Sequence, residues 1–204
     1  MFGLLARRSR KSAAPRPRFV RPSLERLETR DCPSLVTLSV AYGARNSITL
    51  SGNVSGTDAP GGLIVGFSGK ASGQTMTDAN GNFSFTTQAS GVGDVLAATT
   101  DGLSNTPRVT LTDTAPVIKD FIASEGVNRV WTFTGDLTYR SPEGLTMNFS
   151  GLPSLNNQTT TCDYTGHFWF TIQLTPTDNG IAYVKTTDWY GLTSNTASEG
   201  VAQL

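Results

Sequence analysis

Apolar and polar side chains alternate along most of the chain after residue 33. In residues 131–137 the apolar side chains Trp131, Phe133 and Leu137 share one phase of the alternation, while threonine and aspartate fill the other. Residues 48–54 show the same alternation around Ile48 and Leu50. A period of two predicts β-strands with one buried face.

The alternating segments occur in two sets that keep the same order. Residues 48–52 align with 131–135 at an offset of 83, and 60–69 (PGGLIVGFSG) align with 142–151 (PEGLTMNFSG) at an offset of 82. Residues 78–85 then align with 163–170, and 99–105 with 186–195, where the second copy carries small insertions. This ordered self-similarity indicates one structural unit in tandem.

Each copy supplies about seven short strand-like segments. In the first copy we expect strands at residues 35–42, 48–54, 63–67, 74–77, 83–85, 95–99 and 108–112. In the second copy we expect them at residues 117–124, 131–137, 145–149, 158–161, 168–174, 182–186 and 198–202. Seven strands in some 80 residues are typical of an immunoglobulin-like sandwich. The sequence therefore predicts an all-β chain with two tandem immunoglobulin-like β-sandwiches, residues 33–113 and 116–204.

The connections carry their own signals. Residues 78–82 (DANGN) predict a turn in which Asn80 and Gly81 accept positive φ, and we expect it to join two antiparallel neighbours. Residues 114–116 form a linker so short that it should limit the relative freedom of the two sandwiches, and Pro116 should end the strand before it.

Charge separates a leader from the body. Residues 1–30 hold nine basic and two acidic residues, a net charge of +7, and the remaining residues carry −7, so the chain as a whole is neutral. Residues 1–32 predict a disordered basic leader because they are rich in Arg, Ser and Pro and poor in apolar residues. The leader lacks the interleaved aromatic residues of a single-strand binder, which disfavours a nucleic-acid partner.

Two cysteines, Cys32 and Cys162, lie at non-equivalent places in the two copies. Free or incidental thiols fit this placement better than a disulfide between copies, and the pair forms neither a metal site nor a redox motif. No stretch reaches the roughly 18 apolar residues of a membrane span, and the first five residues are too short for an ordinary signal peptide.

Candidate chemistry is sparse, and the sequence predicts no cofactor and no catalytic residue. His167 is the single histidine, and we interpret it as a solvated turn residue. The 78–82 segment begins like a calcium loop but lacks the glutamate at loop position 12, so the turn interpretation is preferred. A calcium ion between the copies, with the candidate ligands Asp101, Asp113, Asp120 and Asp188, is favoured over the calcium loop but not over a chain without calcium.

Aromatic residues give the candidate contact site. Trp189 and Tyr190 are an insertion in a loop where the first copy has only Gly102. They predict either a plug that folds over the end of the sandwich, the interpretation we favour, or a contact for a sugar ring or another partner. Trp169, on the predicted outer face of its strand, is a further candidate contact.

A resemblance covers nearly the whole chain from Ser23 onward. The segment LERLETRDCPS (residues 24–34), which follows a basic stretch, resembles the N-terminal motif of large planctomycete-type bacterial extracytoplasmic proteins. The repeat is similar to the bacterial Ig-like repeats that follow such leaders, above all in APVIKDFIASEG, GLTMNFSGLPSL and TTDWYGLTSNTA of the second copy. The resemblance implies export and an extracytoplasmic, secreted or cell-surface location, and it supplies no catalytic or binding residues. The chain is short for such proteins and carries no evident catalytic, anchoring or dockerin-type module, so it could be a minimal secreted member or a fragment.

These observations predict a non-enzymatic exported or surface protein that acts as a spacer, scaffold or adhesion module toward a protein or cell-wall glycan partner. The alternative is a carbohydrate-binding module that uses Trp189 and Tyr190. A hydrolase site between the sandwiches is a third interpretation, for which the sequence supplies no catalytic triad. The identity of the partner and the oligomeric state do not follow from the sequence.

Overall fold

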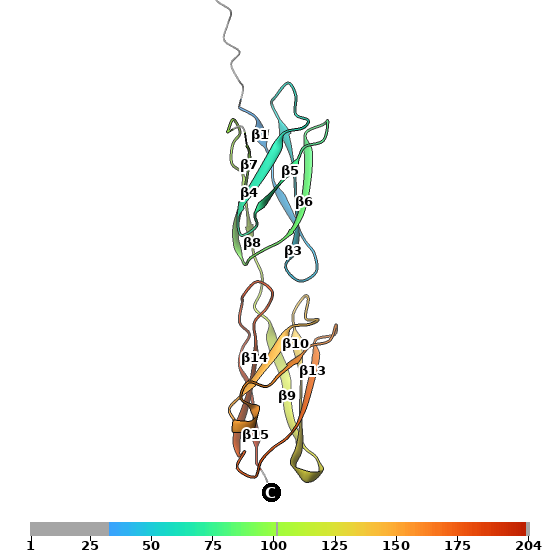
Figure 1. The fold of residues 1–204 in the computed structure, drawn as a ribbon, viewed down its shortest axis with the longest axis vertical. Coiled ribbons are helices and arrows are strands. Elements are labelled where there is room, and N and C mark those ends of the chain that lie inside the picture. Colours follow the sequence, from blue (N-terminus) through green and yellow to red (C-terminus); the bar gives the residue numbers. More distant parts are fainter. Residues whose placement is uncertain (1–32, 101, 203–204) are drawn as a thin grey trace, which may run out of the picture. The chain divides into compact units, whose positions relative to one another are not determined.

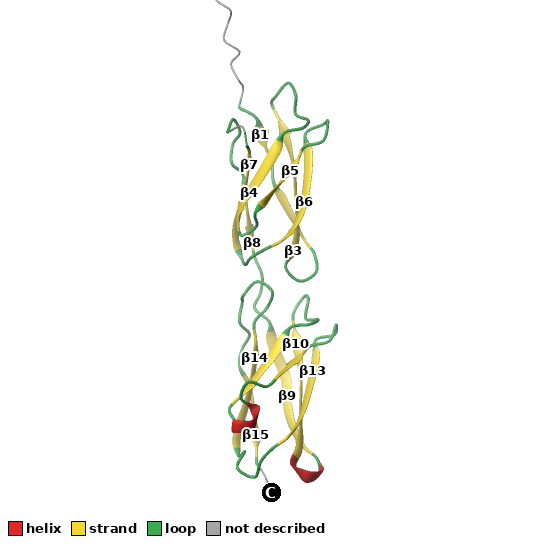
Figure 2. Cartoon of the chain, viewed as in Figure 1, coloured by secondary structure: helices red, strands yellow, loops and turns green. Residues whose placement is uncertain are grey.

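The computed structural model describes residues 33–100 and 102–202. The predictions for the leader, for Cys32 and for Asp101 lie outside the described residues. The described residues form an all-β structure of antiparallel sheets, as predicted (Figures 1 and 2). Within the described residues, the helical pieces are the short 3-10 turns η1 (Val127–Arg129) and η2 (Pro153–Leu155).

The first sandwich consists of eight strands in two sheets. They are β1 (Leu35–Val36), β2 (Ser39–Tyr42), β3 (Ser47–Ser55), β4 (Ile64–Gly69), β5 (Gly73–Met76), β6 (Asn82–Gln88), β7 (Gly93–Thr99) and β8 (Arg108–Leu111). One sheet has the order β5-β4-β7-β8, and in the other β3 lies between β6 and the pair β1 and β2.

The second sandwich repeats this topology with seven strands. They are β9 (Val117–Glu125), β10 (Val130–Thr138), β11 (Thr146–Ser150), β12 (Thr159–Thr161), β13 (His167–Gln173), β14 (Gly180–Thr186) and β15 (Ala197–Val201). The sheets are β13-β10-β9 and β12-β11-β14-β15. Strand β9 therefore takes the place that β1 and β2 share in the first sandwich, and the tandem-sandwich prediction is confirmed.

A repeated glycine accompanies the irregularity in the opening strand of each sandwich. A Cβ on Gly52 would collide with the Thr37 carbonyl, at the break between β1 and β2, and would lie 2.6 Å from the Phe83 ring. A Cβ on Gly135 would lie 2.6 Å from the Phe168 ring, and the pairing of β9 with β10 shifts register between Thr134 and Asp136. Only glycine leaves room for these close approaches.

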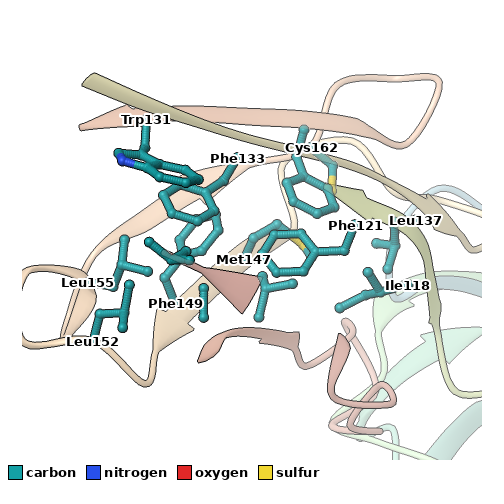
Figure 3. Packing of buried hydrophobic residues seen from close by; sticks show 14 of the residues in the cluster. Ile118, Phe121, Trp131, Phe133, Leu137, Met147, Phe149, Leu152, Leu155 and Cys162 are labelled. Atoms are coloured by element: carbon teal, nitrogen blue, oxygen red, sulfur yellow. The ribbon is translucent and has the colours of Figure 1, made fainter. Parts of the chain in front are cut away.

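Each sandwich has its own hydrophobic core, built from the alternating positions. The first core includes Ile48, Leu50, Val65 and Val95, all fully buried. The second is more aromatic, and Figure 3 shows Phe121, Phe133 and Phe149 packed with Met147 between its sheets. Ring centroids of these phenylalanines lie 5.9–6.3 Å apart, a favourable range for aromatic packing. Cys162 is a free thiol buried in the second core, and burial raises its pKa to about 12.

The turn at residues 78–82 forms, but its predicted role was wrong. Strands β5 and β6, which it joins, belong to opposite sheets and share no backbone ladder; the Thr75 hydroxyl donates to the Ser84 carbonyl between them at 3.1 Å. The Asp78 carboxylate accepts the N–H groups of Asn80 and Asn82 at 2.8 and 2.9 Å, and Gly81 alone in this turn has positive φ. Such a carboxylate-capped turn fixes the chain reversal without fixing which sheet the next strand enters.

A Ser-Asn pair repeated in both copies fastens the opening strand to the opposite sheet. The Asn105 side chain accepts the Val36 N–H at 2.6 Å and donates to the Val36 carbonyl at 3.2 Å. Asn195 does the same to Ile118, at 2.7 and 3.1 Å. The preceding serines, Ser104 and Ser194, each accept a backbone N–H from the preceding strand. Each amide therefore satisfies both backbone groups of an opening-strand residue.

Candidate functional site

The candidate site is the junction between the two sandwiches, built around Arg140. Its guanidinium lies over the rings of Tyr42, at 4.8 Å, and Tyr190, at 5.0 Å. It also pairs with the Asp113 carboxylate at 3.3 Å. Strand β2 supplies Tyr42, and the loop between β14 and β15 supplies Tyr190. One cation thus connects the first sandwich, the linker region and the second sandwich.

Asp113 gathers further polar partners at the end of the first copy. Its carboxylate side chain is only 7% exposed and accepts the Tyr139 hydroxyl at 2.7 Å. Burial, together with the hydrogen bond to Asp113, raises the pKa of Tyr139 further above neutral pH. Tyr42 also bonds the segment between β8 and the linker, because its hydroxyl accepts the Thr112 N–H at 2.9 Å.

Trp189 makes the second half of the junction. Its indole N–H donates to the Ser141 carbonyl at 2.9 Å, and the Arg45 guanidinium lies 4.9 Å from its ring. The backbone N–H of Arg45 in turn donates to the Ser141 hydroxyl at 2.9 Å. Arg45 follows β2 and Ser141 follows β10, so these contacts again cross from one sandwich to the other.

Tyr190 is buried, with 4% of its surface exposed, and it packs with the core residues of the first sandwich although it belongs to the second copy. The loop that carries it is held by Asp188, whose Oδ1 accepts the N–H groups of Tyr190 and Leu192 at 2.8 and 2.7 Å. The other carboxylate oxygen, Oδ2, is buried with no hydrogen-bond partner among the described residues. Tyr190 therefore has no face open for stacking on a sugar while the junction is closed.

The remaining candidates lie elsewhere. Trp169 is 57% exposed on β13, as its strand phase predicted. His167 is the first residue of β13 rather than part of the turn, and its Nδ1 lies 2.9 Å from Asp136 Oδ1. The arrangement of these side chains does not test whether Trp169, Trp189 or Tyr190 contacts a ligand. Ligand contact therefore stays a prediction.

Two of the candidate calcium ligands, Asp113 and Asp188, contact other protein groups. The Asp113 carboxylate pairs with Arg140 and accepts the Tyr139 hydroxyl, and the Asp188 carboxylate accepts loop N–H groups. In residues 33–100 and 102–202, no three His, Cys, Asp or Glu side chains cluster closely enough to hold a metal ion. No helix in that part of the chain is long and apolar enough to cross a membrane.

Several junction residues have no counterpart of the same type in the first copy. Tyr139 and Arg140 align with Gly56 and Thr57, and Trp189 and Tyr190 are absent from the first copy. Sequence reasoning identified the insertion but missed Arg140. The signal that could have identified Arg140 is its mismatch with Thr57, the aligned residue of the first copy.

Comparison with known proteins gives distant structural likeness only. No family model matches the chain, and no curated protein matches its sequence. A bacterial ice-binding adhesin of 1.5 MDa is 15% identical, with a TM-score of 0.36 over 82% of this chain and 64% of that one. A tetra-tandem repeat from the extending region of a large adhesion protein is 14% identical, with a TM-score of 0.40 over 82% and 48%. The FN1–FN3 domains of chicken CNTN1 are 13% identical, with a TM-score of 0.35 over 83% and 67%.

This chain therefore spans about two thirds of the first of these structures and about half of the second. At these identities and TM-scores, the function has to be argued from the chain's own residues.

Proposed function

We propose that this chain is a non-enzymatic, exported Ig-like repeat protein that acts at the cell surface as a semi-rigid spacer, scaffold or adhesion module. The observation that carries the proposal is the Arg140 junction, in which one guanidinium lies between Tyr42 and Tyr190 and pairs with Asp113. A flexible tether has no use for such contacts, whereas a spacer needs them to limit bending.

The energetics of the junction support this role. Interfaces between domains in one chain are commonly polar and mobile. Here a three-residue linker keeps the local concentration of the two surfaces high, and the contacts combine two cation–π pairs with an ion pair to a carboxylate that is 7% exposed. Cation–π contacts are worth about 0.5 kcal/mol when exposed and about 2 when desolvated. The junction is therefore built to hold one arrangement.

The resemblance of residues 24–34 to a planctomycete-type leader motif supports export and a surface location. Fractionation of native cells, with mass spectrometry of the mature N-terminus, tests this part of the proposal. We expect the protein in the extracytoplasmic fraction. Recovery of the protein, with an intact leader, from the cytosol would refute export and leave the spacer argument standing.

Residual dipolar couplings of the full chain in two alignment media test the spacer part. A single alignment tensor should fit the amides of both sandwiches, and the Arg140→Ala variant should need two tensors. Separate tensors in the unaltered protein would show that the sandwiches move independently, and the spacer proposal would fail. The alternative of sugar binding by Trp189 and Tyr190 gains no support, since both side chains are used within the junction.

A further inference from the structure

A single row of side chains crosses the outer face of the sheet β13-β10-β9. Trp169 on β13 and Ile122 on β9 both lie opposite Thr134 on β10. Trp169 is 57% exposed and Ile122 is 52% exposed, while the opposite face of the sheet supplies the core. An indole and an aliphatic side chain are thus displayed in one row on this face.

The first sandwich shows that the fold does not require these residues. The equivalent row there consists of Ser39, Ser51 and Ser84, with the same pairing across its three strands. The next row is alike in both copies. Hydroxyl pairs occupy it, Thr49 with Thr86 at 2.9 Å in the first copy and Thr132 with Thr171 at 3.2 Å in the second. One row has therefore changed from serine to aromatic and aliphatic on an unchanged scaffold.

Polar groups border the indole on both sides. The His167 ring stacks beside Trp169, with centroids 6.1 Å apart and planes at 24°, and its Nδ1 bonds the Asp136 carboxylate. The Thr132 and Thr171 hydroxyls lie on the other side, one row away. Rows on a strand are about 7 Å apart, so a ring stacked on the indole reaches hydrogen-bonding groups at both edges.

Area and charge decide between possible occupants. A stable protein interface buries about 800 Å² on each partner, and a fully buried aromatic side chain contributes about 150 to 250 Å². One indole and one isoleucine, each about half exposed, supply only a fraction of that area. Charged groups of both signs border the row, since Asp136 lies in register with Lys119 and Asp120 is exposed on the same strand as Ile122. The body after residue 30 carries −7, which repels polyanions.

We infer that this row, Ile122–Thr134–Trp169 with Asp136 and His167, is a binding site for an uncharged sugar ring of an extracellular polysaccharide. The C–H face of the ring packs on the indole, and its hydroxyls bond the Asp136 carboxylate on one side and the threonine hydroxyls on the other. The site lies within one sandwich, so it does not depend on the spacer role of the junction; the extracellular source of the sugar rests on the proposed export.

The test is titration of the full chain, followed by tryptophan fluorescence and by calorimetry. The probes are the neutral hexasaccharides cellohexaose, laminarihexaose, mannohexaose and chitohexaose, with hexagalacturonate as the anionic probe. We expect at least one neutral probe to bind with a Kd of about 1 mM or tighter. Trp169→Ser restores the residue of the first copy and should weaken binding about tenfold or more. Asp136→Asn should weaken it several-fold.

The matched control is Tyr164→Ser, which removes an aromatic side chain that is 78% exposed but lies outside the row. This variant should bind within about twofold of the unaltered chain, and thermal melting should show that the variants are folded. The inference is overturned if no neutral probe binds at about 10 mM, if Trp169→Ser binds normally, or if only hexagalacturonate binds. A concentration-dependent dimer that Trp169→Ser abolishes would instead assign the row to a second copy of the chain.

Discussion

Replacement of Arg140 by alanine gives the sharpest test of the junction, because the chain contains a matched ion pair. Arg140 and Arg108 each lie 3.3 Å from an aspartate carboxylate. The Asp113 side chain beside Arg140 is 7% exposed, whereas the Arg108 and Asp94 side chains are 70% and 41% exposed. The two pairs therefore differ in burial and in aromatic neighbours at the same separation.

The expected magnitudes follow from those surroundings. Arg140→Ala removes two cation–π contacts, worth about 0.5 to 2 kcal/mol each, and the ion-pair partner of a largely buried carboxylate, worth about 1 kcal/mol when exposed and more when buried. Asp113 still accepts the Tyr139 hydroxyl, so its carboxylate is not left unpaired. We expect a loss of about 3 kcal/mol in the free energy of unfolding. Arg108→Ala should cost less than about 1 kcal/mol, as exposed ion pairs do.

Urea unfolding of the full chain, followed by circular dichroism and by tryptophan fluorescence, measures both losses. Trp189 reports on the junction itself, because its indole bonds Ser141 there. Arg140→Lys should fall between the two variants, since lysine keeps the charge but cannot stack as a planar cation. If Arg140→Ala and Arg108→Ala destabilise equally, the aromatic enclosure of Arg140 contributes nothing and the junction argument is wrong.

Three further substitutions test single parts of the structure. Tyr190→Ala removes a ring from the core of the first sandwich and should lower the free energy of unfolding by about 3 kcal/mol. Amide hydrogen exchange should rise more at Val95, in the first sandwich, than at Val184, in the second. Equal rises would contradict this packing. The Asp178 carboxylate is fully buried and accepts four hydrogen bonds from Ser154 and Thr175. Despite burial, which alone would raise it, these bonds lower the pKa of Asp178 to about 2. The stability from this group is thus complete above about pH 4 and lost as pH falls toward 2, and melting curves of Asp178→Asn should lose that acid-dependent step. Asn195→Ala should lower the free energy of urea unfolding by about 1 to 3 kcal/mol, because the N–H and carbonyl of Ile118 lose their hydrogen-bond partner. An unchanged free energy would show that water replaces the amide.

The sequence predicted the fold because burial in a sandwich follows strand phase. Ile48 and Leu50 in one copy, and Trp131 and Phe133 in the other, are buried as the alternation requires. The turn at Asp78 shows where that reasoning ends. Its hydrogen bonds are local and legible in the sequence, but the sheet that the next strand joins depends on contacts with β3, which no local pattern encodes.

The junction was harder to predict for a related reason. Trp189 and Tyr190 stood out as an insertion, yet their partners lie far away in the chain, Ser141 at 48 positions from Trp189. Without knowledge of its neighbours, a loop aromatic can be a plug, the interpretation the sequence favoured, or a ligand contact. The plug interpretation is the closer one, except that Tyr190 closes the core of the other sandwich. Only the comparison of the two copies, which puts Thr57 opposite Arg140, could have pointed to the cation that completes it.

A tandem duplication allows each position to be compared between two copies of the same fold. Positions that serve the fold remain matched, as in the glycines Gly52 and Gly135 and in the amides Asn105 and Asn195. Where an exposed pair diverges without a change in backbone pairing, packing inside the sandwich does not explain the difference. Arg140 and Trp169 both diverge in this way, one at the end that meets the other sandwich and one on an outer sheet face. The first divergence therefore belongs to the joining of the copies, and the second to whatever the outer face contacts.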